Sequence, residues 1–160
     1  MNIELSLANV TEAEYLSKLC LESKQYWGYS DAFMANCIDE LSFKATDFDD
    51  SIIVTARVKN KICGVAQLRL NIKNKDGELV KLFVHPNFIS QGVGTVLYHW
   101  AMNTARENNI KELLLDADPN AEAFYIGHGA IKIADVPSAS IVGRVIPQLK
   151  ICIHNEKMEF

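Results

Sequence analysis

The chain has 160 residues, of which 49% are hydrophobic and 22% charged, and its net charge at pH 7 is −4. These values fit one compact domain and leave no room for a second core. The mild acidity, without any cluster of lysine and arginine, argues against a nucleic-acid partner. The first residues lack a basic region followed by a long apolar stretch, and no segment is long enough to span a bilayer. We therefore expect a cytoplasmic protein with no membrane partner.

Hydrophobic periodicity predicts an alternation of strands and helices along the chain. Runs of apolar residues bounded by turn residues indicate strands, and apolar residues three and four apart indicate helices. In chain order the predicted elements are a strand at residues 3–7, a helix opened by a capping box at Thr11–Glu14, a helix at 31–41, strands at 51–58, 62–71 and 79–84, a helix at 92–108, a strand at 112–116, a short helix after Pro119, and strands at 130–134 and 148–153.

The join between the strand at 79–84 and the helix at 92–108 predicts a binding site for an anion. Gly92 and Gly94 lie where the helix begins. Glycine lets a ligand oxygen approach the main chain, and the first turn of a helix offers unpaired N–H groups at the positive end of its dipole. With the next strand, this helix completes a right-handed βαβ unit, whose ligands bind at the carboxyl ends of the strands. We therefore expect an anionic cofactor here.

The cysteines and histidines do not predict a metal site. The four cysteines include no Cys-x-x-Cys pair, and the four histidines show no metal-ligand spacing. Cys152 and His154 are the one near pair. We therefore expect no metal.

Three segments resemble, in order and separation, the GNAT superfamily of acyl-CoA-dependent N-acyltransferases. They are Leu82-Phe83-Val84-His85-Pro86, Ser90-Gln91-Gly92-Val93-Gly94-Thr95 and Ala123-Phe124-Tyr125-Ile126-Gly127-His128-Gly129-Ala130. The resemblance covers essentially the whole chain, residues 1–160. It implies a single α/β (α+β) domain whose mixed central sheet has an antiparallel N-terminal meander and a splayed parallel pair at the cofactor site, with helices on both faces.

The resemblance also implies acetyl-CoA as cosubstrate and direct attack of a primary amine on it in a ternary complex. The residues implied to contact the cofactor are Leu82, Phe83, Val84, Gln91, Gly92, Val93, Gly94, Thr95, Asn120, Phe124 and Tyr125. The sequence departs from the family at Ile89, where glutamine or arginine is usual, and at Asp118, where asparagine is frequent. Asn120 could supply the missing amide.

Two side chains are candidates for proton transfer. Tyr125 matches the family tyrosine that protonates the departing thiolate, although a half-buried structural tyrosine is an alternative. Val80 occupies the position of the family glutamate. Glu78 is expected on the same strand face as Val84 by alternation, and is the candidate base through water, unless it is only a solvated residue at the start of a strand. His85 is expected to point away and to have a structural role.

The acceptor is predicted only as a small-molecule or peptide amine. Tyr26, Trp27 and Tyr29 surround a glycine and could form one wall of its pocket or pack under a loop. Arg144 could bind a carboxylate of the substrate or form an internal salt bridge. The apolar run at 149–153 would serve as the pairing surface of a homodimer.

Two other functions remain open. A nicotinamide dinucleotide fold also has a glycine loop, with Asp116 or Asp118 near the place of its ribose-binding acid, but its third glycine would fall at Leu97. The stronger alternative is a GNAT-like module that senses acyl-CoA without efficient turnover, because Val80 and Ile89 depart from the family pattern.

Overall fold

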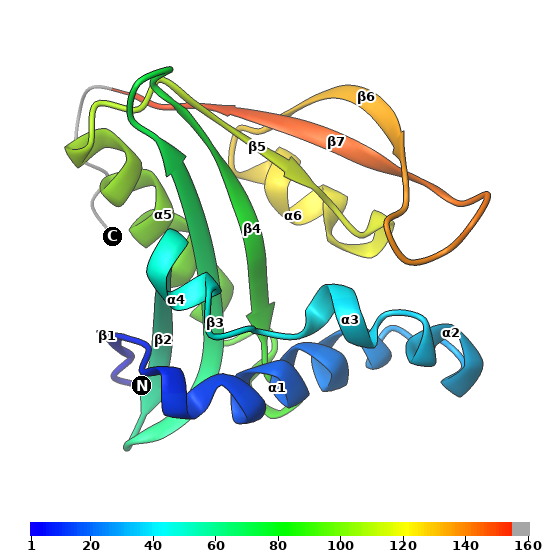
Figure 1. The fold of residues 1–160 in the computed structure, drawn as a ribbon. Helices are drawn as coiled ribbons and strands as arrows, with labels where there is room; N and C mark the ends of the chain where they lie inside the picture. Colours follow the sequence, from blue (N-terminus) through cyan, green and yellow to red (C-terminus); the bar gives the residue numbers. More distant parts are fainter. Residues whose placement is uncertain (155–160) are drawn as a thin grey trace.

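A computed structural model describes residues 1–154 of the chain. They form a single mixed α/β domain on one seven-stranded sheet, with the strand order β1-β2-β3-β4-β5-β7-β6 (Figure 1). The strands are β1 (Glu4–Leu7), β2 (Ile52–Val58), β3 (Lys61–Asn71), β4 (Asp76–Val84), β5 (Glu112–Asp116), β6 (Ile131–Pro137) and β7 (Val145–Cys152). The helices are α1 (Ala13–Gln25), α2 (Asp31–Ala35), α3 (Ile38–Leu41), α4 (Asp47–Asp50), α5 (Val93–Glu107) and α6 (Glu122–Gly127), with 3₁₀ turns η1 (Val10–Glu12), η2 (Pro86–Phe88) and η3 (Pro119–Ala121).

The predicted meander and the splayed parallel pair are both confirmed. Strands β1 to β4 pair antiparallel with their neighbours in sequence. Strands β4 and β5 pair parallel over three positions only, from Asp76 with Glu112 to Glu78 with Leu114. Beyond these positions the two strands diverge (Figure 1). The divergence leaves the main chain at the carboxyl end of β4 without a β5 neighbour.

The ladder between β3 and β4 contains a bulge. Lys81 pairs with Gln67, whereas Leu79 pairs with Leu68, so Val80 is the extra residue in β4. Paired residues of neighbouring strands share a face of the sheet. The bulge therefore reverses the alternation of side chains on the amino-terminal side of Val80.

Two neighbouring residues of β3 show which helices cover which face. Val65 packs with Leu16 of α1 in one core cluster, and Ala66 packs with Leu97 of α5 in another. Successive strand residues point to opposite faces, so α1 and α5 cover opposite faces of the sheet (Figure 1). Buried residues of α3 share the α1 cluster, and Tyr125 of α6 packs with residues of α5. This confirms helices on both faces.

The capping box predicted at Thr11–Glu14 begins two residues earlier in the structure, at Asn9. Asn9 caps η1, since its Oδ1 accepts the Thr11 N–H at 2.9 Å, while Glu12 Oε1 accepts the Asn9 N–H at 2.9 Å. The predicted helix at 31–41 is also wrong, because α2 ends at Ala35 and α3 begins at Ile38. The Asn36 side chain donates to a carbonyl of α2, at Ala32, and such local bonds compete with helix continuation.

The last two strands are longer than predicted, and the loop between them is shorter. Pro137 and Pro147 lie between the predicted strands at 130–134 and 148–153, but they pair with Val145 and Asp135, respectively, in the ladder of β6 and β7. A proline lacks only the N–H, and its carbonyl still accepts, as the Pro147 oxygen does from Ala117 at 2.9 Å.

The apolar run at 149–153 does not offer the exposed surface expected for a homodimer. Leu149 and Ile151 are buried in the core of the domain. Strand β7 pairs with β5 on one side and with β6 on the other, so it has no free edge. Homodimerisation stays a prediction, but the run at 149–153 is not exposed as its pairing surface.

Candidate active site

One cavity of about 440 Å³ lies at the carboxyl end of β4. Its walls come from five parts of the chain that are distant in sequence. They are Ser23, Lys24 and Trp27 from α1 and the residues after it, Leu82–Val84 from β4, the stretch from Phe88 to Thr95, Asp118–Ala121 around η3, and Phe124 and Tyr125 from α6.

The amino terminus of α5 opens into this cavity. Gly92 precedes the helix in a left-handed conformation with φ +88, and no side chain of the described residues caps it. The first intrahelical bond runs from the Val96 N–H to the Gly92 carbonyl at 3.1 Å, so the N–H groups of the first turn point out of the helix. A Cβ on Gly94 would lie 3.4 Å from the Phe124 ring. These features fit a loop that binds an anionic group, as the glycine spacing predicts.

Most of the predicted cofactor residues line this cavity, and two do not contribute side chains to it. Leu82, Phe83, Val84, Gly92, Gly94, Thr95, Asn120, Phe124 and Tyr125 all line the cavity. Gln91 is exposed, and its amide donates to the Asn87 carbonyl at 3.2 Å. The Val93 side chain is buried in the core, so only its N–H can face a ligand. Lys24 was missed, because no sequence pattern connects the end of α1 with a loop seventy residues later.

Tyr125, the candidate proton donor, is buried at the wall of the cavity. It lines the cavity and is 6% exposed. Burial, and then the neighbouring Tyr98, raises the pKa of Tyr125 above the usual value for a phenol. The hydroxyl therefore keeps its proton at neutral pH.

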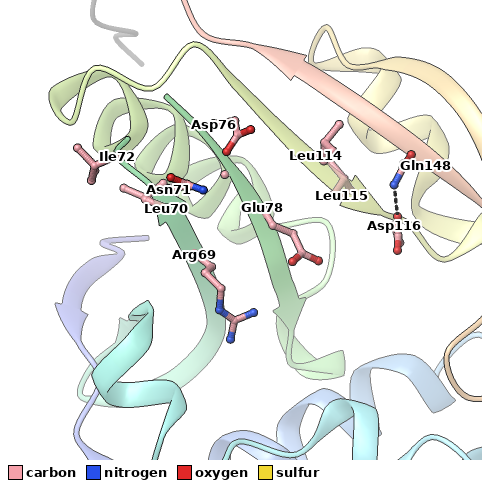
Figure 2. Close-up of a pocket in the computed structure, with 11 residues that line it drawn as sticks. Arg69, Leu70, Asn71, Ile72, Asp76, Glu78, Leu114, Leu115, Asp116 and Gln148 are labelled. Atoms are coloured by element: carbon pink, nitrogen blue, oxygen red, sulfur yellow. Dashed lines mark hydrogen bonds between the residues drawn. The ribbon is translucent and has the colours of Figure 1, made fainter. Parts of the chain in front are cut away.

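Glu78 lines a different pocket from Tyr125. This second pocket, of about 680 Å³, lies over β3, β4 and β5 and includes Arg69, Asp76 and Asp116 (Figure 2). In Figure 2 the Glu78 carboxylate extends from β4 toward the β5 side, and the Gln148 amide donates to Asp116 at 3.1 Å. The two candidate proton-transfer residues, Glu78 and Tyr125, thus line separate pockets.

The expectation that Glu78 shares a strand face with Val84 is wrong. Glu78 pairs with Arg69, whose guanidinium lies 3.5 Å from Asp47 of α4. Val84 packs on the other face, in the cluster that includes residues of α5. The alternation rule fails because the bulge at Val80 adds one residue between them.

A polar cluster centred on Tyr29 lies at the edge of the cavity. It joins the loop after α1, the segment after β5 and the loop between β6 and β7. The Tyr29 hydroxyl donates to Asp118 Oδ2 at 2.9 Å and accepts from Arg144 Nη2 at 2.8 Å and from Asn120 Nδ2 at 3.1 Å. Lys24 Nζ lies 3.4 Å from Asp118 Oδ2. Burial opposes ionisation of Asp118, but hydrogen bonds from Asn120 and Tyr29 and the charge of Lys24 outweigh it and lower the pKa of that carboxyl.

The aromatic segment divides between the cavity and the surface. Trp27 lines the cavity, while Tyr26 is 57% exposed and packs edge-on against Trp27. Tyr29 stacks on Phe33 with ring centroids 4.1 Å apart, and the Arg144 guanidinium lies 5.0 Å from the Phe33 ring. Arg144 therefore has internal partners, as in the salt-bridge alternative considered for it.

His85 has contacts of a structural kind. Its Nδ1 accepts the Asn87 N–H at 3.1 Å at the start of η2, and its Nε2 lies 3.3 Å from Glu22 of α1. The His85 N–H donates to the Cys63 carbonyl at 2.8 Å. This main-chain group is therefore occupied, and because N–H groups alternate in direction along a strand, the Val84 N–H points toward the β5 side.

Within residues 1–154, no group of three or more histidine, cysteine, aspartate or glutamate side chains could hold a metal ion. In the same residues, none of the helices has the length and apolar character that a membrane crossing requires.

Comparisons with known proteins identify a family and similar folds. The model of the acetyltransferase (GNAT) family matches residues 16–130. The PaiA N-acetyltransferase from Thermoplasma acidophilum, solved in complex with coenzyme A, has a TM-score of 0.79 at 18% identity, over 95% of this chain and 99% of that one. The ribosomal-protein-S18-alanine N-acetyltransferase from Escherichia coli has a TM-score of 0.70 at 15% identity, over 99% and 100%.

A third similar structure is that of YncA, a putative acetyltransferase from Salmonella typhimurium, with its cofactor acetyl-CoA. It has a TM-score of 0.67 at 13% identity, over 100% of this chain and 99% of that one. A comparison with curated protein sequences finds no match. The structural likenesses show the fold, and the family model, which matches more than half of the chain, shows that this protein belongs to the GNAT acetyltransferase family.

Proposed function

We propose that this protein is an N-acetyltransferase that moves the acetyl group of acetyl-CoA to a primary amine in a ternary complex. One observation carries the proposal. A single cavity is lined by the open first turn of α5, the end of β4 that has no β5 neighbour, and Tyr125. These would serve as an anion-binding site, a main-chain edge and a proton donor.

The residues of the cavity fit the parts of acetyl-CoA, which supplies a thioester when bound. The N–H groups at the start of α5 would hold its pyrophosphate, with Gly92 and Gly94 allowing close approach. The main chain of Leu82–Val84 would hydrogen-bond the pantetheine arm. The Val84 N–H, on the side of β4 away from β3, would stabilise negative charge on the carbonyl oxygen.

The reaction needs a proton removed from the amine and one given to sulfur. The amine nitrogen forms a bond to the carbonyl carbon, the carbon–sulfur bond breaks, and sulfur leaves with the electron pair. Tyr125 would protonate that sulfur. An amine with a pKa of about 10.4 is almost fully protonated at pH 7, so a base is also needed. Glu78 would accept this proton through water from the second pocket.

One observation favours an acyl-CoA sensor as a second candidate function. Among the described residues that line the cavity, Asp118 is the carboxylate, and Tyr29, Asn120 and Lys24 already surround it. Glu78 lies in the other pocket. A protein with this arrangement would bind the cofactor, and its turnover would depend on whether Glu78 can act through water.

Calorimetric titration with acetyl-CoA tests the proposal, with NADH as a parallel control. Saturable binding of acetyl-CoA but not NADH is expected, followed by thiol release when a panel of primary amines is added. Binding without thiol release for any amine would favour the sensor. The absence of acetyl-CoA binding would contradict both, and binding of NADH instead would support the dinucleotide alternative.

A further inference from the structure

The hydrogen bonds of His128 fix the position of its ring proton. Its Nδ1 lies 2.9 Å from the Phe124 carbonyl, which can only accept, so Nδ1 carries a hydrogen. Its Nε2 lies 3.3 Å from Thr95 Oγ1. A neutral imidazole has one N–H, so in that state Nε2 accepts the hydroxyl proton of Thr95.

The ring cannot easily turn to change this arrangement. Its centroid lies 4.5 Å from that of Phe124 and 4.8 Å from that of Tyr98. The Tyr98 hydroxyl also donates to the His128 main-chain carbonyl at 3.3 Å. Flipping the ring would break the bond to Phe124, so the packing holds Nε2 toward Thr95.

While His128 is neutral, the Thr95 hydroxyl has no proton to donate to a phosphate. Thr95 belongs to the first turn of α5, and it lines the cavity beside Gly92 and Gly94. A hydroxyl has one proton, and here His128 receives it. Toward the cavity Thr95 then offers lone pairs, and the oxygens of a diphosphate diester also offer only lone pairs. The two would repel rather than bond.

We propose that His128 is a positioning residue whose protonation turns the Thr95 hydroxyl into a donor for the cofactor's pyrophosphate. When Nε2 gains a proton it donates to Thr95 Oγ1, and the hydroxyl proton becomes available to a phosphate oxygen. The new positive charge also favours the anion. Binding of the cofactor at this loop therefore takes up a proton at His128. The inference rests on the proposed function, since it needs a pyrophosphate in the cavity.

The titratable groups around the ring do not compete for this proton. His99, on α5, lies with its ring 6.1 Å away, and burial, followed by the charge of His128, lowers the pKa of His99. Burial raises the pKa of Tyr98 to about 12. Tyr125, from α6, also has a raised pKa because it is buried. Burial therefore disfavours the charged form of all three groups.

Calorimetric titration with dephospho-CoA between about pH 7.5 and about pH 6 tests the proposal. A phosphate monoester such as the 3′-phosphate of CoA titrates near pH 6, and dephospho-CoA avoids this because it keeps only the diphosphate diester. The affinity of the protein for dephospho-CoA should rise by about two- to tenfold for each unit by which the pH falls, where tenfold corresponds to uptake of one whole proton. Buffers of different ionisation enthalpy measure that uptake directly. Pantetheine, which has no phosphate, should bind without a slope.

Three variants change the linkage in different ways. In His128→Gln the amide nitrogen replaces Nε2, in His128→Asn it replaces Nδ1, and Thr95→Val removes the hydroxyl. The two His128 variants should bind dephospho-CoA with an affinity independent of pH in this range and with no proton uptake. Thr95→Val should keep only the smaller slope that comes from the charge of His128. His154→Asn, at a histidine near the carboxyl end of the described chain, should keep the wild-type slope.

The outcomes separate this inference from the proposed function. If dephospho-CoA and acetyl-CoA fail to bind at every pH, the proposed function fails. If both bind but the wild type takes up no proton, or if His128→Gln and His128→Asn keep the slope, or if Thr95→Val keeps the whole slope, only the role of His128 is overturned. A slope lost in His99→Asn and kept in His128→Gln would also overturn it. Proton uptake by the wild type tests the inference even if a variant does not fold.

Discussion

Glu78 and Lys81 point to the same face of β4, although they are three positions apart along the chain. The cause is the bulge at Val80, which shifts the pairing of β4 with Gln67 and Leu68 of β3. Lys81 is buried on this face against Phe43, with its ammonium 3.1 Å from Gln67 Oε1, whereas Glu78 is exposed in the second pocket. The bulge thus brings a carboxylate to the α1 side of the sheet, where an acceptor could approach without crossing the cofactor cavity.

Replacement of Glu78 tests whether this carboxylate is the base. In Glu78→Gln we expect kcat to fall by about 10²-fold, because general-base catalysis contributes about 10²–10⁴-fold. The affinity for acetyl-CoA should be unchanged. Glu112→Gln is the matched control, since Glu112 pairs with Lys150 at the surface at 3.8 Å. Equal rates for the two variants would remove Glu78 from the mechanism.

Replacement of Tyr125 tests the proton donor. Tyr125→Phe keeps the buried ring and removes the hydroxyl, so we expect kcat to fall by about 10²-fold with little change in KM for acetyl-CoA. Since burial raises the pKa of Tyr125, the wild-type rate should not fall between about pH 7 and 9 through loss of this proton. Full turnover by Tyr125→Phe, at an unchanged unfolding temperature, would leave the residue a structural role.

The sequence predicts the parts of this site that depend on local residue types. The glycine loop, the strand before it and the helix after it could be predicted because Gly92, Gly94 and the apolar period act over a few positions. The bulge at Val80 could not, because it depends on how β4 pairs with β3. The cluster of Tyr29 with Asp118 and Arg144 joins residues about a hundred positions apart, which no periodicity connects.

Substitutions in the glycine loop should weaken cofactor binding, by backbone strain at one position and by crowding at the other. Gly92→Val forces a β-branched residue to a φ of +88, and Gly94→Val places side-chain atoms against Phe124. Both should weaken acetyl-CoA binding by at least about tenfold, measured by calorimetry. In Gly127→Ala the added Cβ meets nothing within 4 Å, so this variant should bind as the wild type does. Unchanged affinity in both valine variants would place the cofactor elsewhere.

The internal contacts of Arg144 predict an effect on stability. Arg144→Ala removes the donor to the Tyr29 hydroxyl and the cation over the Tyr29 and Phe33 rings. We expect the free energy of unfolding to fall by about 1–3 kcal/mol, measured by denaturant unfolding. The KM for the acceptor amine should stay within about twofold of the wild type. A large rise in that KM with unchanged stability would instead support binding of a substrate carboxylate by Arg144.

Asp118 should make the stability of the fold depend on pH. The pKa of this carboxyl is lowered in the folded state, because the hydrogen bonds and Lys24 outweigh the effect of burial. The unfolded chain therefore binds the proton more readily, so this contribution to stability is full above the unfolded pKa of about 3.9 and is lost as the pH falls through the folded value.

Asp118→Asn, which introduces the residue more frequent in the family, tests this linkage. The variant should be less stable than the wild type at pH 7, because Lys24 and Arg144 lose their carboxylate partner at the Tyr29 cluster. The difference between the two proteins should shrink as the pH falls from about 5 toward 2, since the wild-type carboxylate becomes neutral there. Denaturant unfolding at a series of pH values measures it, and a constant difference across that range would show that the charge of Asp118 does not contribute to stability.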